Sequence, residues 1–350
     1  MSNPDVTLTL MQAAEAVQAV LEADKTPILW GSPGIGKTTI IEQMIARIVN
    51  RTGEQRFSRV ITLDAAALAD GTVQGGVPIP DMAAGVTRWL PPDYFVNQVD
   101  DRALIFLDDI GVLQPSSLAP LLRMIQFKQV GSYKLPDGVR FALASNRETE
   151  NAGAQKLTTA LNNRLVHLEV VASAEEVIRY ALQRNWDITV PMFLKFKEEA
   201  VSDFDKNVKA FPSPRSWEAT SDLVKQFAVN PLGNVELSLI CGAIGQKYGF
   251  EFNAFRDLYK SLPTAEQVFM APATTVVPDE FDGKYAILGS LLKKVSTQNV
   301  GAFITYIDRF GIPFLVAALK DMTVMRPELN ETKPFIDRAS KDDLQAAMFR

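Results

Sequence analysis

Apolar residues follow two different rhythms along the first 170 residues of the chain. Short apolar runs, typical of buried strands, alternate with stretches whose apolar residues recur three and four positions apart, as on one face of a helix. The expected strands are 26–31, 59–65, 103–109, 139–146 and 164–170, and the expected helices are 11–23 and 38–50. Thr9 and Gln12 have the spacing of a capping box at the start of the first helix. Strands that alternate with helices predict a parallel, doubly wound α/β sheet.

One segment, residues 71–95, interrupts this rhythm. Its two short apolar stretches, VPI and VTRW, lie on either side of Gly85. Strand-like runs around a glycine are typical of a β-hairpin, because glycine adopts turn conformations that other residues avoid. We therefore expect a hairpin insert within an α/β domain of residues 1–170.

The chain after this domain has helical periodicity. Ser173 and Glu176 have the spacing of a second capping box. They open a helical domain that spans residues 171–262 and is interrupted at 211–217.

The last part of the chain, residues 263–350, begins differently. Residues 263–281 contain three prolines and little periodicity, which predicts a linker or a surface loop. Residues 282–350 are again helical by pattern, so a helical C-terminal segment is expected after the linker.

Composition narrows the classes of function. The chain has 350 residues, 47% of them hydrophobic, and a formal net charge of -5, so no overall positive field draws it to nucleic acid or to an anionic membrane. Its one cysteine, Cys241, excludes an intramolecular disulfide, and its one histidine, His167, excludes a multi-histidine metal site. The N-terminus lacks the features of a signal peptide, and no apolar run approaches the roughly 20 residues that span a bilayer. A cytoplasmic protein with no membrane partner is expected.

The sequence GSPGIGKT at 31–38 matches the phosphate-binding pattern G-x-x-x-x-G-K-[ST], after an expected strand and at the start of an expected helix. Glycines let backbone N–H groups curl around phosphate oxygens, and the helix N-terminus adds a favourable dipole. Lys37 is expected to reach the β- and γ-phosphates of ATP, and Thr38 to bind Mg²⁺. The alternative is a glycine-rich turn that merely connects a strand to a helix. The expected nucleotide-binding residues are Gly31, Ser32, Pro33, Gly34, Ile35, Gly36, Lys37, Thr38 and Thr39.

Two adjacent carboxylates, Asp108 and Asp109, end the expected strand at 103–109. In P-loop enzymes a second strand ends in an aspartate that holds Mg²⁺, which suits Asp108; the neighbouring acid would orient or deprotonate the attacking water. Asn146 ends another expected strand, where its amide is able to contact the γ-phosphate or that water. The alternatives are a helix cap with a surface charge for the two acids, and a turn for Asn146.

With these residues in this order, the chain resembles the AAA+ ATPases, and within them the MoxR-like branch. The phrases that carry the resemblance are VPI…TRWLPP, KLPDGVRFALASNR, NNRLVHLEV and FPSPRSWE. The resemblance implies an AAA+ core followed by an α-helical lid. The catalytic residues it implies are Asp109, Asn146, Arg164 and Arg215. Arg164 matches the arginine finger that reaches a neighbouring subunit's nucleotide, and Arg215 matches a second sensor on the lid. Without the resemblance, both arginines read as surface residues.

The resemblance also implies an assembly. A finger that completes the next subunit's site requires head-to-tail contacts, which close into rings, and MoxR-like proteins form hexamers. The hairpin would then lie near the central face of a homo-hexamer, where Arg88, Trp89 and Leu90 contact a partner or a threaded chain. Packing of Trp89 against its own domain is an equal alternative. MoxR-like ATPases act on protein partners, often with a von Willebrand factor A domain, and mature or activate them.

The chain departs from the family pattern at one catalytic position. The usual second acid is glutamate, and here it is Asp109, which is about 1.5 Å shorter in reach. Because a misplacement of about 1 Å costs on the order of 100-fold in rate, slow hydrolysis is expected. The leading hypothesis is an ATP-hydrolysing remodeller of a protein partner. The alternatives are a nucleotide-gated scaffold with little turnover and a nucleic-acid motor, which would need a basic, aromatic track that the acidic balance argues against.

Overall fold

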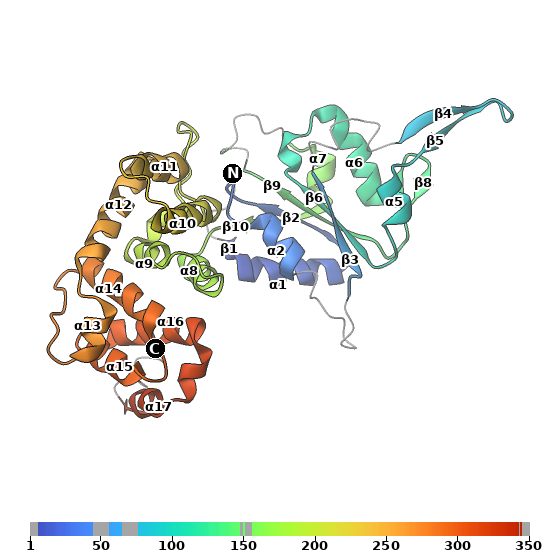
Figure 1. The fold of residues 1–350 in the computed structure, drawn as a ribbon. Helices are drawn as coiled ribbons and strands as arrows, with labels where there is room; N and C mark the ends of the chain where they lie inside the picture. Colours follow the sequence, from blue (N-terminus) through green and yellow to red (C-terminus); the bar gives the residue numbers. More distant parts are fainter. Residues whose placement is uncertain are drawn as a thin grey trace. The chain divides into compact units, whose positions relative to one another are not determined.

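The computed structural model describes residues 6–44, 56–64, 76–147, 150, 156–342 and 344. The chain divides into two compact units, which Figure 1 draws with their elements labelled. Unit 1 comprises Met1–Ala172 and Phe204–Lys206, and unit 2 comprises Ser173–Asp203 and Asn207–Arg350. All strands of the described residues lie in unit 1, whereas the described elements of unit 2 are helices.

Unit 1 is built around a six-stranded sheet in which every neighbouring pair is parallel. Across the sheet the strands are β1 (Thr7–Leu8), β10 (Leu165–Val170), β2 (Thr26–Trp30), β9 (Arg140–Ser145), β6 (Ala103–Asp108) and β3 (Arg59–Asp64). The predicted parallel, doubly wound α/β sheet is confirmed, and β1 is an edge strand that the apolar pattern did not indicate. Because all strands run the same way, their carboxyl ends meet at one edge, where ligands bind in open α/β sheets.

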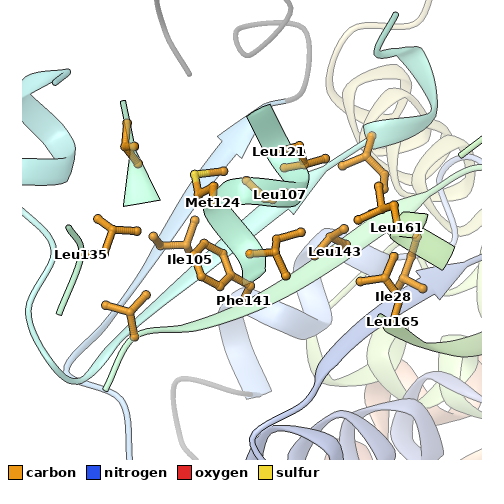
Figure 2. Close-up of a cluster of buried hydrophobic side chains, with 14 of the residues drawn as sticks. Ile28, Ile105, Leu107, Leu121, Met124, Leu135, Phe141, Leu143, Leu161 and Leu165 are labelled. Atoms are coloured by element: carbon orange, nitrogen blue, oxygen red, sulfur yellow. The ribbon is translucent and has the colours of Figure 1, made fainter. Parts of the chain in front are cut away.

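Helices cover both faces of this sheet, and each face has its own apolar core. Successive strand residues point to opposite faces, so Ile105 and Leu107 belong to one cluster, while Leu104 and Phe106 belong to the other. The first cluster, drawn in Figure 2, lies against α5 (Asp93–Asn97), α6 (Pro115–Phe127) and α7 (Thr159–Asn162). The second cluster lies against α1 (Leu10–Glu22) and α2 (Lys37–Met44). Strands buried on both faces need continuous apolar runs, which explains the stretch ALIFL.

The first helix begins where the sequence predicts. Thr9 Oγ1 accepts a hydrogen bond from the Gln12 N–H at 3.4 Å, and Gln12 Oε1 accepts one from the Thr9 N–H at 3.0 Å. This reciprocal pair is the predicted capping box. The helix expected at 38–50 is α2, and residues 45–50 of that prediction lie outside the described residues.

The segment that interrupts the strand–helix rhythm contains the predicted hairpin. Its two antiparallel strands are β4 (Val77–Asp81) and β5 (Val86–Leu90). Gly85 takes a φ of 63° in the turn between them, a left-handed conformation that favours glycine. The pair projects away from the sheet of its own unit (Figure 1). Trp89 is 44% exposed, so its ring lies outside the core of unit 1.

The hairpin surface is largely apolar. Its exposed apolar side chains are Val77, Ile79, Met82, Val86, Trp89 and Leu90. The strand β4 also contains Pro78 and Pro80, which have no backbone N–H to donate. A second, unpredicted hairpin of β7 (Gln129–Val130) and β8 (Tyr133–Lys134) lies beside it, and the Ser132 hydroxyl donates to the Trp89 carbonyl at 3.3 Å. Residues 71–75 of the expected insert lie outside the described residues.

Unit 2 has its own aromatic core. Trp217 is fully buried, contacts the rings of Phe193 and Phe252, and donates from its indole N–H to the Ala200 carbonyl at 2.6 Å. Ser173 caps the first helix by accepting from the Glu176 N–H at 3.5 Å, as its spacing predicts. The helices are α8 (Ala174–Gln183), α9 (Thr189–Phe196), α10 (Pro214–Val229), α11 (Val235–Ile244), α12 (Gln246–Ser261), α13 (Ala265–Met270), α14 (Phe281–Lys294), α15 (Val300–Asp308), α16 (Ile312–Met325) and α17 (Lys333–Ala339). None of the described helices is both long and apolar enough to span a bilayer.

The stretch expected as a linker, residues 263–281, contains the helix α13. Thr264 and Gln267 form a capping box at its start, a signal that the prolines concealed. Pro263 precedes the cap and Pro272 follows the last helical residue, so these prolines delimit the helix and do not prevent it. The helical domain and the C-terminal segment together form unit 2.

Candidate functional site

The loop 31–38 between β2 and α2 follows a backbone path that requires its glycines. Gly34 and Gly36 have φ values of 78° and 109°, in the left-handed region. A Cβ atom added to Gly31 would lie 2.5 Å from Ile35 Cδ1 and 2.7 Å from the Val170 carbonyl oxygen. The loop therefore reaches the N-terminus of α2 by a tight turn, which presents backbone N–H groups to an anion.

The other residues of the loop differ in exposure. Ile35 is buried in the core of unit 1, so its side chain anchors the loop and leaves only its backbone for a nucleotide. Ser32 and Pro33 are half-buried, and Thr39 is exposed in the first turn of α2. Of these four predicted residues, Ser32 has a side-chain hydroxyl that bonds within the site region, to Glu150 Oε1 at 2.6 Å.

Lys37 lies buried at the base of the loop. Its ammonium donates to two backbone carbonyls of the loop at 2.6 and 3.1 Å, and to Asn146 Oδ1 at 2.9 Å. Burial lowers the pKa of Lys37 to about 8, and the charges of Asp108 and Asp109 oppose that shift. A cation held only by oxygens in a half-closed site is suited to bind phosphate oxygens.

Thr38 and Asp108, the two residues predicted to bind Mg²⁺, are hydrogen-bonded to each other. The Thr38 hydroxyl donates to Asp108 Oδ2 at 2.5 Å, and Asp108 Oδ1 accepts from the Asp109 N–H at 2.9 Å. Both side chains offer hard oxygen atoms, which Mg²⁺ prefers, and Mg²⁺ commonly takes only one or two protein ligands beside phosphates and water. Among the described residues no three His, Cys, Asp or Glu side chains converge on one point. The donor set therefore fits Mg²⁺ bound together with a nucleotide.

Asp109 has an unusual backbone. Its φ and ψ are 54° and 41°, the left-handed helical region, at the entry to the short 3-10 helix Ile110–Val112. Its Oδ1 accepts from Asn146 Nδ2 at 3.0 Å. Burial and the neighbouring Asp108 carboxylate raise the pKa of Asp109, against the attraction of Lys37. Aspartate and asparagine tolerate the left-handed region better than glutamate, so the backbone accounts for the shorter acid at this position.

The order of the strands brings these residues together. The strand β9 lies between β2 and β6, so Asn146, just past its end, lies between the phosphate loop and the two acids. The amide uses both ends, accepting from Lys37 and donating to Asp109. Five predicted residues thus meet at one edge of the sheet: Lys37, Thr38, Asp108, Asp109 and Asn146.

Two predicted residues lie elsewhere. Arg164 directly precedes β10 at the opposite, amino edge of the sheet, where Leu165 pairs with Thr26. It is exposed, and its guanidinium donates to the Ala160 carbonyl at 2.6 Å. Arg215 is an exposed residue in the first turn of α10 in unit 2.

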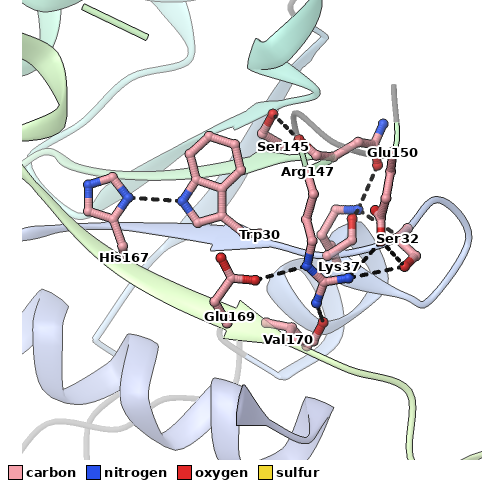
Figure 3. A network of polar contacts seen from close by, with 11 residues as sticks. Trp30, Ser32, Lys37, Ser145, Arg147, Glu150, His167, Glu169 and Val170 are labelled. Atoms are coloured by element: carbon pink, nitrogen blue, oxygen red, sulfur yellow. Dashed lines mark hydrogen bonds and ion pairs between the residues drawn. The ribbon is translucent and has the colours of Figure 1, made fainter. Parts of the chain in front are cut away.

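Sequence reasoning missed a second polar network at the carboxyl edge, drawn in Figure 3. It centres on Arg147, which has no defensible role by sequence and pairs with Glu150 at 2.7 Å and Glu169 at 2.9 Å. It also missed Asp64, whose charge contributes to the raised pKa of Asp109 and which pairs in register with Asp108. Their positions in the sequence could have indicated them, because Arg147, Glu169 and Asp64 each lie at or just past the carboxyl end of a parallel strand. Glu150 does not lie at a strand end.

These parts define the class of the protein. A parallel sheet carries a phosphate loop after one strand, an aspartate pair after another and an asparagine after the strand between them, and a helical unit follows. This is an α/β fold with a P-loop.

Comparisons with known proteins find local similarity. No protein-family model matches the chain. A stretch of 89 residues, 25% of this chain, is 34% identical to the chaperone protein ClpB of Blochmanniella floridana. A stretch of 145 residues, 40% of this chain, is 27% identical to the Nif-specific regulatory protein of Bradyrhizobium diazoefficiens. These matches span only 9% and 24% of the two relatives' own lengths.

Solved structures are similar at a low level over most of the chain. The RuvB Holliday junction branch migration motor of Thermotoga maritima is 15% identical with a TM-score of 0.33, covering 94% of this chain and 85% of that one. Domain III of the replication initiation protein DnaA from the same organism is 15% identical with a TM-score of 0.38, covering 71% of this chain and 96% of that one.

Proposed function

We propose that the chain is an ATP-hydrolysing AAA+ ring ATPase of the MoxR-like type that remodels or activates a protein partner. The observation that carries this proposal is the set of hydrogen bonds from Lys37 through Asn146 to Asp109, beside the Thr38–Asp108 pair. It joins a phosphate-binding ammonium, a sensing amide and a water-orienting acid, which are the parts that phosphoryl transfer to water uses.

Each residue of the site has a separate role in this proposal. Lys37 and the N-terminus of α2 bind the β- and γ-phosphates. Asp109 orients the attacking water and accepts its proton, and its raised pKa makes it a better proton acceptor than a surface aspartate. Asn146 fixes the orientation of Asp109 and links it to Lys37. Mg²⁺ bound by Thr38 and Asp108 supplies neutralisation of the phosphate charge.

The position of Arg164 supports a site shared between subunits. It lies at the amino edge of the sheet, and the strand that separates it from the phosphate edge, β10, has six residues and spans roughly 20 Å. That span is beyond the reach of a side chain, so Arg164 is unable to serve the phosphates of its own chain. An arginine finger offered to the next copy requires a head-to-tail contact, which closes into a ring; we propose a homo-hexamer, with Arg215 as the second sensor.

The hairpin of β4 and β5 supports a protein partner. It combines exposed apolar side chains with the ion pair of Arg88 and Asp81 at 2.7 Å. Exposed apolar surface on a projecting element is typical of protein contact sites. The proposal of a von Willebrand factor A-domain partner rests on the MoxR-like resemblance.

Steady-state ATP hydrolysis by the full chain tests the proposal. Wild type is expected to hydrolyse ATP slowly, and Lys37→Ala is expected to lose ATP binding and to lower turnover on the order of 100-fold or more. The matched control is Lys25→Ala. Lys25 is exposed and directly precedes β2, the strand whose other end leads into the phosphate loop. This variant is expected to behave as wild type. Equal turnover in Lys37→Ala and wild type would contradict the proposed site.

A nucleotide-gated assembly scaffold is the second candidate, and Asp109 favours it. The acid is short, and Asn146 already bonds one of its oxygens. This candidate predicts that ATP and a non-hydrolysable analogue assemble the chain equally well in sedimentation velocity, with turnover near background. Assembly that requires continuing hydrolysis would instead favour the working ATPase.

A further inference from the structure

Arg147, two positions beyond the end of β9, has four partners in unit 1 (Figure 3). Its guanidinium donates to Glu150 Oε1 at 2.7 Å, Glu169 Oε2 at 2.9 Å, the Val170 carbonyl at 3.0 Å and the Ser32 hydroxyl at 3.2 Å. Only 24% of its side chain is exposed. The partners lie on three separate segments: the phosphate loop, the turn after β9 and the end of β10.

Only arginine has the shape for this arrangement. Its planar guanidinium carries five N–H donors in a fixed fork, whereas a lysine ammonium offers three donors around one point. In this structure Nε and Nη2 bond to Glu169 and Val170 at the end of β10, while Nη1 bonds to both Ser32 and Glu150. A lysine at this position keeps the charge but is unable to hold the phosphate loop and the end of β10 at the same time.

The network carries more negative than positive charge beside the phosphate loop. Two carboxylates share one guanidinium, and within the described residues the buried Glu150 Oε2 has no hydrogen-bond partner. The charges of Glu150 and Arg147 both act on the pKa of Lys37, in opposite directions. A phosphate held by the loop therefore brings like charge toward Glu150, which weakens the hold of Glu150 on the shared Arg147.

The other side of the network leads out of unit 1. Val170 is the last residue of β10, the Val171 N–H donates to the Leu8 carbonyl at 2.9 Å, and unit 2 begins at Ser173. Building on the proposed ATP site, we propose that Arg147 is a positioning residue that links occupancy of the phosphate loop to the path of the chain between β10 and unit 2. When phosphate binds, Arg147 gives up its bond to Glu150 and holds Glu169 and Val170 more strongly.

The test measures the response of the two units to nucleotide in the full chain. A donor and an acceptor dye are placed by Glu22→Cys and Lys225→Cys, both at exposed positions, in a Cys241→Ala background that removes the native thiol. Energy transfer is compared with ADP and with a non-hydrolysable ATP analogue, and kcat and KM for ATP are measured on the same proteins. The variants are Arg147→Lys, which keeps the positive charge but loses the guanidinium fork, and Glu169→Gln, which keeps the size but loses the negative charge.

Both variants are expected to keep KM within about twofold, to lower kcat about tenfold and to lose the difference in energy transfer between the two nucleotides. The control is Arg140→Lys, an arginine at the other end of the same strand that pairs with Asp24 at 2.9 Å. It is expected to retain the nucleotide response. If Arg147 had only a structural role, Arg147→Lys and Arg140→Lys would lower thermal stability by similar amounts. The change in energy transfer between the two nucleotides would then remain in both variants.

The outcomes separate this inference from the proposed function. An intact nucleotide response in Arg147→Lys, or an equal loss in Arg140→Lys, overturns the role of Arg147. A wild-type chain whose energy transfer does not change with nucleotide overturns it too, whatever its turnover. A wild-type chain that responds to nucleotide without hydrolysing ATP contradicts the proposed ATPase, and the Arg147→Lys result then still decides the inference.

Discussion

The polar residues at the two edges of the central sheet differ in how they are hydrogen-bonded and in how far they are exposed. At the carboxyl edge Asn146 bonds to both Lys37 and Asp109, and all three side chains are partly or fully buried. At the amino edge Arg164 is exposed and donates to a carbonyl of its own preceding helix. The comparison teaches that the polar residues of the carboxyl edge are connected to one another within the chain, whereas the amino edge presents Arg164 as an exposed cation.

The largest effect is expected at the amino edge. Arg164→Ala is expected to retain ATP binding and to lower kcat by about 1,000-fold, because a finger arginine stabilises charge in the transition state. Mixing this variant with Lys37→Ala should restore part of the activity, since some interfaces then pair an intact loop with an intact finger. Arg59→Ala, an exposed arginine at the start of β3 on the same edge, is the control. Absence of rescue at every mixing ratio would argue against a shared site.

At the carboxyl edge, Asp109→Asn is expected to lower kcat about 100-fold with little change in ATP affinity, because asparagine is unable to accept a proton from water. The same variant is expected to raise thermal stability at neutral pH. Since the pKa of Asp109 is raised in the folded state, the folded chain loses stability as pH rises past the ordinary value of 3.8, and asparagine removes that cost. Undiminished turnover in Asp109→Asn would show that another group activates the water.

The buried Lys37 ammonium gives the carboxyl edge a pH dependence. Burial lowers the pKa of Lys37 to about 8, so the ammonium loses its charge as pH rises from about 7 to about 9. ATP affinity, measured by titration calorimetry, is expected to fall about tenfold over that range. Lys37→Arg keeps its charge and should flatten the curve. A steep curve in the arginine variant would assign the titration to another group.

The smallest effect is expected from lengthening the acid. Asp109→Glu restores the usual reach but places glutamate in a left-handed backbone, which costs roughly 1 kcal/mol of folding free energy. The net change in kcat is expected to stay within about tenfold. Thermal unfolding measures the loss of folding free energy, and steady-state kinetics measures the change in kcat. A variant as stable as wild type would mean that the backbone does not select aspartate.

The sheet of unit 1 was predictable because its strands are buried on both faces, which forces continuous apolar runs such as ALIFL. The phosphate loop was predictable because its glycines and lysine all lie within one short stretch of sequence, residues 31–38. The stretch at 263–281 was not read as helical, because its prolines masked a six-residue helix with its own capping box.

The Arg147 network could not be predicted from the sequence, because it depends on the order of strands in the sheet. Glu169 on β10 lies beside the phosphate loop because β10 neighbours β2 in the sheet, and local apolar patterns do not encode the order of strands. The left-handed backbone at Asp109 was equally hidden, since aspartate occurs in many conformations. Only the folded backbone explains why the acid there is short.

The two prolines of β4 bear on how the chain avoids unwanted association. In the described sheets β4 pairs with β5 alone, so its outer edge is open to a further strand. Within a strand, proline occurs where its nitrogen faces away from the neighbouring strand. Pro78 and Pro80 therefore leave the outer edge of β4 without N–H donors at two alternate positions. An added strand would lose those hydrogen bonds. The hairpin is thereby able to display apolar side chains while remaining a poor template for strand-by-strand aggregation.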